Sequence, residues 1–434
     1  MKNVFRMKTE YGDRGVIMRL EQIDDNTYLE FWDAYPYQNF WQSLSMCHFR
    51  QERLSWDYEC VGLYNDQNEL AAACTLQSMP SFGKYKAYTA LRGFLIDYDD
   101  AGLVDTFLDL LKEYLHEHDC LYMKTDPYTE YQSRTKDGEP YGEKRDDLIG
   151  IFEKHGFKHE GFGELDTEVN EPRFMSVLPL QDKTAEEIFA GFHAQTRQNI
   201  NNTEKEGIKI RELGEDEMDK LSDLVSLTGG KREFFTPDAS YYKFFKECFG
   251  ENMKAYYAYL DVNDYIDRYQ KVIDEEENKI AELGDGELSK KQQSRKNQSL
   301  QKIASAKKRV AEGEELLKEA GAELPLAAAM FVFTDYEVVY LFSGSDDTYK
   351  HFKAPYAIQW KIIQEAKEKG VQRYNFYGIS GHFNEDEEGY GVYLFKKGFG
   401  ADVVELIGSF QYVDRPKEYK LYSGLRKIKH TFIK

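Results

Sequence analysis

The sequence predicts an α/β (α+β) protein of two tandem, related domains, with an antiparallel coiled-coil hairpin inserted in the second. Three observations support this prediction. Strand and helix patterns alternate along both halves of the chain, a helix–strand pattern of the first half recurs in the second, and a long charged segment has apolar residues at helical spacing on both sides of a glycine turn. The length of 434 residues agrees with two separate cores.

The first domain is expected over residues 1–165. Its patterns begin with two aromatic helices and continue with strands whose ends are marked by polar turns. A stripe of apolar residues at 103, 104, 107, 108, 111 and 115 predicts a long helix. The expected helices are 28–55 (in two parts), 103–118 and 149–155, and the expected strands are 58–64, 69–78, 85–96 and 120–125, with a further strand after the turn at 156–161.

The second domain is expected over residues 166–434 and begins near the run Arg173–Leu180, after a polar stretch. A capped helix pair at 184–207 follows, and Gly207 ends it. The expected strands of this domain are 207–211, 256–260, 326–333, 337–345, 375–377 and 403–407, and its remaining expected helices are 215–226 and 351–369. The tail 424–434 is basic, with apolar residues at helical spacing, so it could pack on the domain or touch anionic lipid.

Two matched segments indicate an internal duplication. IFEKHGFKHEGFG at 151–163 is similar to LFKKGFGADVVEL at 394–406, and a similar helix and strand precede each of them. Together with paired helices, an antiparallel run and a strand–helix–strand unit, this order suggests two acetyltransferase-like (GNAT) domains.

The hairpin is expected over residues 261–322. Val262, Ile266, Tyr269 and Ile273 begin a stripe at 4-3 spacing that only Glu276 interrupts, and the bend falls at Gly284. The outgoing arm carries a run of acids, 274–277, whereas the returning arm is basic. The opposite charges could pair the two arms with each other, or the basic arm could contact RNA. The basic residues are Lys290, Lys291, Arg295, Lys296, Lys302, Lys307, Lys308 and Arg309.

Composition restricts the functions that fit this fold. The net charge of −20 argues against general coating of nucleic acid, so any RNA contact must use a local basic patch. Five widely spaced cysteines without a CxxC pair predict free thiols and no structural metal site. No signal-like core or run of about 20 apolar residues is present, so a cytoplasmic protein is expected.

The run 374–408 is the most informative stretch for function. A short aromatic strand at 375–377 leads into a glycine-rich, acidic loop, and an apolar run then ends at Lys396 and Lys397. Spacing alone leaves two interpretations of Lys396. It could be a surface lysine at a helix end, or its side chain could end in a cleft between strand and loop.

The motifs YNFYGISG, LFKKGFGA and VVELIGSF resemble the C-terminal signature of the FemA/FemB/FemX/MurM family (FemABX). These are non-ribosomal peptidyltransferases that use aminoacyl-tRNA to build the peptidoglycan cross-bridge. The resemblance implies that Lys396, after Phe395, is the catalytic residue. It also implies that the hairpin contacts tRNA, since such proteins carry a hairpin that is similar to the arm of seryl-tRNA synthetase.

The same resemblance implies an acceptor site. Arg50 matches, with arginine for lysine, a position near the acceptor's diphosphate, and Tyr241 and Tyr340 match pocket tyrosines. Pro237 stands where the family carries an arginine, so Lys231 or Arg232 would have to replace that contact. The segment 91–97 resembles the family's RGP-type strand, with Phe94 in place of the usual proline. Asp97 and Phe395 are further expected substrate contacts.

An aminoacyl ester is already activated, so its transfer to an amine needs no ATP loop, metal or other cofactor. The sequence contains no GxxxxGK[ST], HExxH or GxSxG motif. Lys396 would hold positive charge near the tetrahedral oxyanion. Asp97 and the acidic residues 385–388 are candidates for taking the amine proton, although the acids also suit a solvated loop.

The expected reaction therefore moves Gly, Ala or Ser from aminoacyl-tRNA to the stem-peptide lysine, or to a partly built bridge, of lipid II or its nucleotide precursor UDP-MurNAc-pentapeptide. The resemblance also implies transient contact with the inner membrane surface and a possible homologous Fem-type partner. Two alternatives remain open: a coenzyme A-dependent N-acyltransferase of the same fold, and a non-catalytic docking protein that uses the hairpin.

Overall fold

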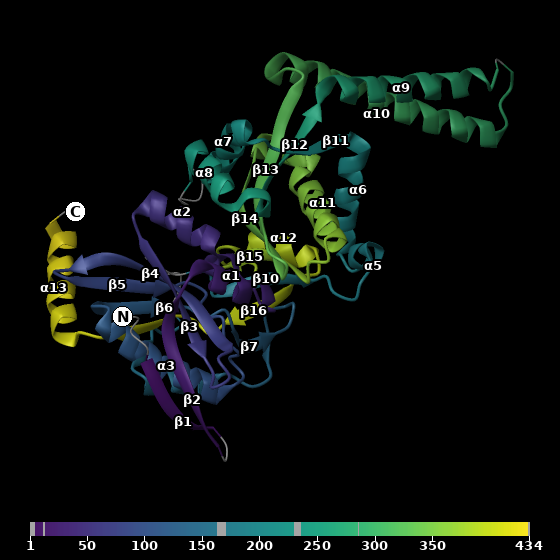
Figure 1. The fold of residues 1–434 in the computed structure, drawn as a ribbon. Coiled ribbons are helices and arrows are strands. Elements are labelled where there is room, and N and C mark those ends of the chain that lie inside the picture. Colours follow the sequence, from purple (N-terminus) through teal and green to yellow (C-terminus); the bar gives the residue numbers. More distant parts are fainter. Residues whose placement is uncertain (1–4, 12–13, 163–170, 230–235, 285, 433–434) are drawn as a thin grey trace.

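The computed structural model describes residues 5–11, 14–162, 171–229, 236–284 and 286–432. Within these ranges the chain is a mixed α/β fold whose strands form two sheets (Figure 1). A helical hairpin projects from the second sheet, away from the first. All five cysteines are free thiols. None of the helices in the described ranges has the length and apolar content needed to cross a membrane.

The first sheet is antiparallel except where β5 pairs in parallel with β6. The chain crosses between these two strands through α3, whose apolar stripe, including Phe107 and Leu111, is buried on the sheet. Its strands, in spatial order, are β1 Phe5–Tyr11, β2 Arg14–Ile23, β3 Asp57–Tyr64, β4 Leu70–Phe82, β5 Tyr85–Ala90, β6 Cys120–Thr125, β17 Phe410–Val413 and β9 Phe157–His159. The helices before and between them are α1 Asp25–Ala34, η1 Phe40–Gln42, α2 Leu44–Leu54, α3 Ala101–Glu117 and α4 Asp146–Lys154.

The second sheet has the same plan, with β14 and β15 as its parallel pair and α11 as the crossover. In spatial order its strands are β11 Ile208–Glu212, β12 Met253–Asp261, β13 Glu323–Phe333, β14 Glu337–Ser345, β15 Arg373–Ile379, β10 Phe174–Pro179, β16 Asp402–Leu406, β7 Glu130–Arg134 and β8 Pro140–Tyr141. The helices of this half are α5 Ala185–Ala190, α6 Ala194–Glu206, η2 Glu215–Glu217, α7 Met218–Gly229, α8 Ala239–Phe249, η3 Gly250–Asn252, η4 Asp347–Phe352, α11 Ala354–Glu368, α12 Tyr390–Gly398 and α13 Pro416–Phe432.

The recurring sequence pattern has a structural counterpart. In the first half, β5, α3 and β6 are followed by α4 and β9, and in the second half β14, α11 and β15 are followed by α12 and β16. The matched segments at 151–163 and 394–406 thus supply the final helix and strand of each unit.

The two halves exchange strands across the expected boundary between residues 165 and 166. Strands β7 and β8 precede this boundary but extend the second sheet beside β16. Strand β17, near the C-terminus, lies between β6 and β9 in the first sheet. Each sheet therefore contains strands from both sides of the boundary, and the two halves are interlocked.

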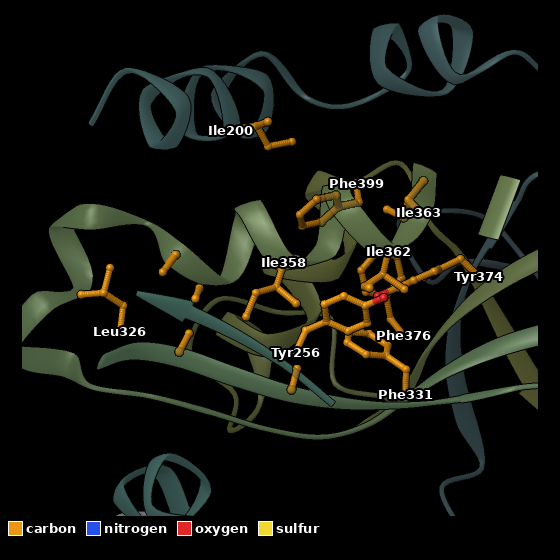
Figure 2. Close-up of a cluster of buried hydrophobic side chains, with 14 of the residues drawn as sticks. Ile200, Tyr256, Leu326, Phe331, Ile358, Ile362, Ile363, Tyr374, Phe376 and Phe399 are labelled. Carbon is orange, nitrogen blue, oxygen red and sulfur yellow. The ribbon is translucent and has the colours of Figure 1, made fainter. Parts of the chain in front are cut away.

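The core of the second half lies between its sheet and α11 (Figure 2). Ile358 and Ile362 of α11 are buried because they lie four residues apart on one face of the helix. They pack among aromatic side chains of the strands, including Phe331 and Phe376. A fully buried side chain of this kind contributes about 1.5–3 kcal/mol, so this core fixes α11 and β15, which position the candidate site.

The projecting hairpin consists of α9 Val262–Ala281 and α10 Lys290–Ala320, inserted between β12 and β13. Ile273 and Ile303 are buried between the helices. Glu276, the acid that interrupts the apolar stripe, is also buried there and accepts a hydrogen bond from Ser299 Oγ at 2.6 Å. Hydrogen bonds from Lys279, Ser299 and Lys302 lower the pKa of the Glu276 carboxyl to about 2.

One strand is shorter than the sequence predicts. The pattern at 85–96 predicts one strand. In the structure β5 ends at Ala90, because Arg92 has a left-handed backbone with φ 51°. Side chains from the preceding helical segments hold the following turn, since Asn39 donates to the Arg92 carbonyl at 3.1 Å and Gln42 to the Leu91 carbonyl at 2.9 Å. The N-terminal strands β1 and β2 were not anticipated from their sequence pattern.

Candidate functional site

Lys396 lies on α12 and is 5% exposed. Its Nζ donates hydrogen bonds to the carbonyl oxygens of Gly378, at 2.5 Å, and Tyr377, at 3.3 Å. Both partners are main-chain carbonyls at the end of β15. Burial lowers the pKa of Lys396 to about 7. Because the side chain is enclosed, the interpretation of Lys396 as a solvated surface lysine is wrong.

The backbone of β15 presents these two carbonyls. Tyr377 has φ 66°, a conformation that residues other than glycine rarely adopt. Asn375 Oδ1 accepts a hydrogen bond from the Tyr377 N–H at 2.8 Å. At Gly378 a side chain would collide with the ring of Pro172, so only glycine fits beside this segment.

The first half of the chain supports α12 through the β7–β8 hairpin. Lys397 forms an ion pair with Asp137 at 2.5 Å, and Tyr393 donates a hydrogen bond to the Lys136 carbonyl at 2.7 Å. Phe395 of α12, expected to contact substrate, packs on α11, where the centroid of its ring lies 5.0 Å from that of Tyr356. Lys396 thus lies where residues of both halves meet.

Arg50 and Tyr241 are brought together although they are far apart in sequence. Phe49 of α2 packs on Tyr241 of α8, with ring centroids 5.0 Å apart. The Arg50 guanidinium lies 4.7 Å from the ring of Trp56 and donates a hydrogen bond to Gln77. Burial lowers the pKa of Arg50, which the nearby Glu171 carboxylate opposes. Burial raises the pKa of Tyr241 to about 12.

The buried Arg92 and Asp126 and the half-buried Glu171 form a charged group next to Arg50 that the sequence interpretation missed. Arg92 is 3% exposed and lies 3.3 Å from Asp126. Burial raises the pKa of Glu171 to about 7, and the charge of Arg92 opposes this rise. These residues come from different loops, and no sequence motif joins them, so spacing alone could not have grouped them.

Of two further expected site residues, Tyr340 packs on the hydrophobic core and Asp97 lies at the surface. Tyr340 stacks on Phe331 at 5.5 Å between ring centroids, in the same core cluster as Phe395, and burial raises its pKa to about 12. Asp97 is exposed and accepts a hydrogen bond from the Asp99 N–H at 2.9 Å in the turn before α3. Among the described residues, the contacts of Asp97 do not join it to Lys396.

The structure does not describe the residues that were expected to make the second diphosphate contact. Lys231 and Arg232 lie outside the described residues. Pro237, at the position of the family arginine, offers only its carbonyl, which accepts a hydrogen bond from Ser222 at 3.1 Å.

The eight basic residues between positions 290 and 309 of the hairpin divide into two groups. Lys302 pairs with Glu276 at 3.1 Å, Lys307 with Glu277 at 3.7 Å, and Arg309 with Glu206 at 3.2 Å. Pairing between the arms therefore accounts for part of the charge. Within the described ranges the others form no ion pair, and all but the half-buried Lys296 are exposed: Lys290, Lys291, Arg295, Lys296 and Lys308.

Fold and site define a class of protein: an α/β chain of two interlocked sheets with a buried lysine where its halves meet and a projecting helical hairpin. Residues 23–427 match the family model described as the FemAB family, and the chain belongs to this family. The resemblance found in the C-terminal motifs is confirmed.

Individual relatives cover almost the whole chain. It is 36% identical to aminoacyltransferase FemB of Staphylococcus epidermidis (strain ATCC 35984) over 375 residues, 86% of this chain and 90% of the relative. It is 32% identical to aminoacyltransferase FemA of Staphylococcus aureus (strain MRSA252) over 421 residues, 95% of this chain and 99% of the relative. The crystal structure of FemX has the same fold, with a TM-score of 0.77 and 23% identity over 93% of this chain and 99% of that one.

Proposed function

We propose that this chain is a tRNA-dependent aminoacyltransferase of peptidoglycan cross-bridge synthesis. It transfers Gly, Ala or Ser from aminoacyl-tRNA to the stem-peptide lysine, or to a partly built bridge, of lipid II or its nucleotide precursor. The supporting observation is Lys396, a buried lysine whose ammonium is held by two main-chain carbonyls, in a family whose relatives are named aminoacyltransferases. Each half of the chain corresponds, in this proposal, to one acetyltransferase-like unit.

Lys396 supplies positive charge in the reaction. The acceptor amine attacks the ester carbonyl, the new C–N bond forms, and the bond from the carbonyl carbon to the ribose oxygen breaks. The amine proton leaves to solvent or to the departing ribose oxygen. With a pKa of about 7, Lys396 is partly protonated near neutral pH. An oxyanion forming beside it favours the protonated form, which stabilises the tetrahedral intermediate.

The acceptor site is proposed at Arg50 and Tyr241. The Arg50 guanidinium hydrogen bonds to a neutral amide, Gln77, so this contact does not compensate its charge. A guanidinium can bind a phosphate with two parallel hydrogen bonds, which suits the diphosphate of both proposed acceptors. Tyr340 and Phe395 remain proposed substrate contacts. Neither Asp97 nor any other residue is assigned the role of general base.

The donor tRNA is proposed to lie along the hairpin. Five of the eight basic residues between positions 290 and 309, among them Lys290 and Arg295, form no ion pair within the described part of the chain. These cations can replace the counterions of an RNA backbone even though the chain as a whole is acidic. Charged tRNA is a cytoplasmic donor, so the proposed reaction takes place on the cytoplasmic side.

Helix α13 is the proposed contact with the membrane surface. Its inner face packs on the first sheet, where Tyr419 lies 5.3 Å from the ring of Tyr122. On its outer face Leu421 and Leu425 are 57% and 52% exposed. Exposed Lys417 and Lys420 flank Leu421. A helix with leucines and lysines on one face suits a surface of anionic lipid.

A transfer assay tests the proposed function. Total tRNA charged with labelled amino acids is incubated with the protein and purified lipid II, and in parallel with the nucleotide precursor. We expect one amino acid to enter the acceptor, which identifies both the donor amino acid and the acceptor. Absence of transfer to both acceptors would contradict the proposal. Binding of coenzyme A would then favour the N-acyltransferase alternative, and no binding would favour the docking protein.

A further inference from the structure

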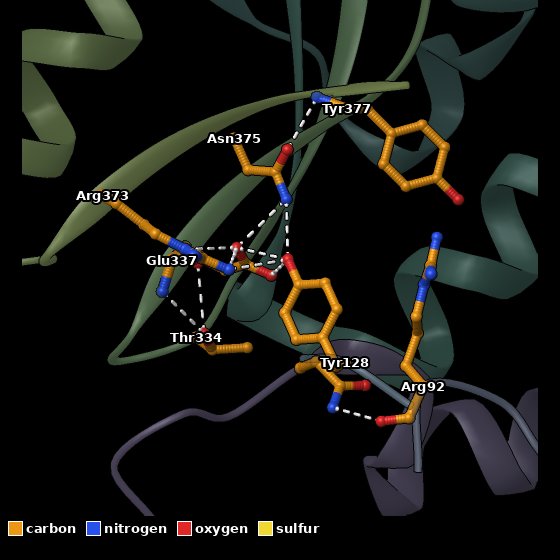
Figure 3. A network of polar contacts seen from close by, with 8 residues as sticks. Arg92, Tyr128, Thr334, Glu337, Arg373, Asn375 and Tyr377 are labelled. Atoms are coloured by element: carbon orange, nitrogen blue, oxygen red, sulfur yellow. Dashed lines mark hydrogen bonds and ion pairs between the residues drawn. The ribbon is translucent and has the colours of Figure 1, made fainter. Parts of the chain in front are cut away.

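A buried polar network joins the first half of the chain to the strand that faces Lys396 (Figure 3). Its centre is Glu337 on β14, which is 1% exposed. The hydroxyl of Tyr128, from the segment between β6 and β7, donates to Glu337 Oε1 at 2.8 Å, and Arg373 forms an ion pair with Glu337 at 2.9 Å. The Glu337 charge is therefore compensated inside the protein.

Asn375 is the member of this network that contacts the backbone of Tyr377, whose carbonyl accepts from Lys396. It is fully buried, and its Nδ2 donates to Tyr128 Oη at 3.0 Å and to Glu337 Oε2 at 3.1 Å. These two bonds orient the amide so that its Oδ1 accepts the hydrogen bond from the Tyr377 N–H (Figure 3). The orientation of the Asn375 side chain is thus set by residues from both halves of the chain.

Tyr377 transmits this orientation to the lysine. Its left-handed backbone is unfavourable for tyrosine, so it persists only where surrounding contacts hold it. The bond to Asn375 is such a contact. With the Tyr377 N–H held by Asn375, the next peptide group is turned so that the Tyr377 carbonyl accepts from Lys396 Nζ. A relaxed Tyr377 would turn this carbonyl away.

We propose that Asn375 is a positioning residue for Lys396, acting through the backbone of Tyr377, and that Tyr128 couples this positioning to the first half of the chain. The inference rests on the proposed function, because it assigns Lys396 to the reaction. Neither Asn375 nor Tyr128 is required to touch substrate. The interlock of the two halves thereby has a consequence for the chemistry: a displacement at Tyr128 changes the place of the lysine ammonium.

The kinetic test uses Asn375→Leu and Tyr128→Phe in the full-length protein. Asn375→Leu removes the hydrogen bond that holds the Tyr377 N–H, so it should lower kcat about tenfold. Tyr128→Phe leaves that bond in place and should lower kcat less, and KM for both substrates should stay within about twofold of wild type in both variants. The matched control is Tyr114→Phe, since the hydroxyl of Tyr114 also donates to a glutamate, Glu59, at 2.8 Å, but this tyrosine is buried in the first core. The control should retain the wild-type kcat.

A double-mutant cycle separates positioning from a general loss of structure. In a Lys396→Ala background, Asn375→Leu should leave the residual rate unchanged, because the residue through which it acts is absent. An equal fold-loss of rate with and without Lys396 would overturn the proposal. If Asn375→Leu does not fold, as judged by circular dichroism, the cycle is run with Tyr128→Phe.

A second readout does not depend on transfer activity. Lys396 is labelled with an amine-reactive reagent at several pH values, and the extent is measured by mass spectrometry. We expect Asn375→Leu and Tyr128→Phe to raise its labelling rate several-fold, while Tyr114→Phe does not. Unchanged labelling would overturn the positioning role. If wild type transfers nothing but the labelling changes as expected, the proposed function fails and the positioning of Lys396 stands.

Discussion

The Nζ of Lys396 lies 2.5 Å from the carbonyl oxygen of Gly378, so the buried ammonium on α12 is held by the main chain of β15. A carbonyl can hold an ammonium in place without neutralising its charge, whereas a carboxylate would neutralise it. Burial without such neutralisation lowers the pKa of Lys396 to about 7. A negative charge that forms beside a lysine in this environment raises its pKa and so favours the protonated, charged form.

Replacing Lys396 by alanine should lower kcat by about 100- to 1000-fold, because the charge that stabilises the oxyanion is lost. Binding of acyl-tRNA and of the acceptor should be preserved, as measured by fluorescence anisotropy. Lys367→Ala is the matched control, since Lys367 also donates to a carbonyl, that of Leu180 at 3.1 Å, away from the site. Loss of rate in the control as large as in Lys396→Ala would contradict the assigned role.

Stability should depend on pH through Lys396. The folded-state pKa of about 7 lies below the ordinary value of 10.5, so between these values the unfolded chain binds more protons than the folded chain. The free energy of unfolding should therefore rise with pH across this window, and the penalty for the buried charge is largest below pH 7.

The change that tests this dependence is Lys396→Met, which removes the titrating group. Urea unfolding should show that the stability of the variant relative to wild type falls by about 2–3 kcal/mol between pH 6 and pH 9, since a tenfold change in proton affinity is worth about 1.4 kcal/mol. A relative stability that stays constant over this range would show that Lys396 titrates normally in the folded state.

Arg50→Ala should weaken use of acceptors that carry a diphosphate. We expect KM for lipid II and for the nucleotide precursor to rise about tenfold or more, because a charge-assisted contact to phosphate is lost. The control substrate is the free stem peptide, which lacks the diphosphate. Wild type and variant should use this peptide with the same kcat/KM, and an equal defect on all acceptors would argue against a phosphate contact at Arg50.

Replacing the five hairpin cations that form no ion pair within the described part of the chain by glutamine should impair use of tRNA and spare use of the acceptor. These residues are Lys290, Lys291, Arg295, Lys296 and Lys308. KM for aminoacyl-tRNA should rise at least about tenfold at moderate salt, and its dependence on salt should become shallower. The matched control is the double variant Lys302→Gln and Lys307→Gln, whose side chains already pair with Glu276 and Glu277. The control should have a much smaller effect, and equal losses for tRNA and acceptor would refute the role of the hairpin.

Changing Leu421 and Leu425 to serine should reduce binding to vesicles that contain phosphatidylglycerol. Each leucine that enters the lipid surface contributes about 1.5–3 kcal/mol, so flotation assays should show at least a tenfold loss of partitioning. Leu300→Ser is the control, since this leucine of α10 is 48% exposed. If the wild-type protein does not bind such vesicles, the outer face of α13 is not a membrane contact.

Much of the fold was predictable because the signals are local. The stripe of α3 and the two arms of the hairpin each follow from spacing within one segment. The end of β5 was not predictable, since the left-handed backbone of Arg92 depends on Asp126, whose Oδ1 accepts the Arg92 N–H at 2.8 Å. The contact comes from a residue 34 positions later in the chain.

The candidate site was predictable only as separate residues. The C-terminal motifs identify Lys396 and the family, but the burial that sets the charge state of the lysine arises from packing of α12 on β15. Asn375 lies inside the motif, yet its role appears only with Tyr128, 247 residues earlier.

The sequence alone predicts most of the helices and strands, though not β1 and β2, together with the duplication and the family, because periodicity and motifs are properties of neighbouring residues. The exchange of β7, β8 and β17 between the sheets depends on the folded chain, as does the group of Arg50, Tyr241 and Glu171. These features depend on contacts between distant segments. Such contacts form when apolar surface is buried and buried polar groups find partners, and the pattern of any one segment does not specify them.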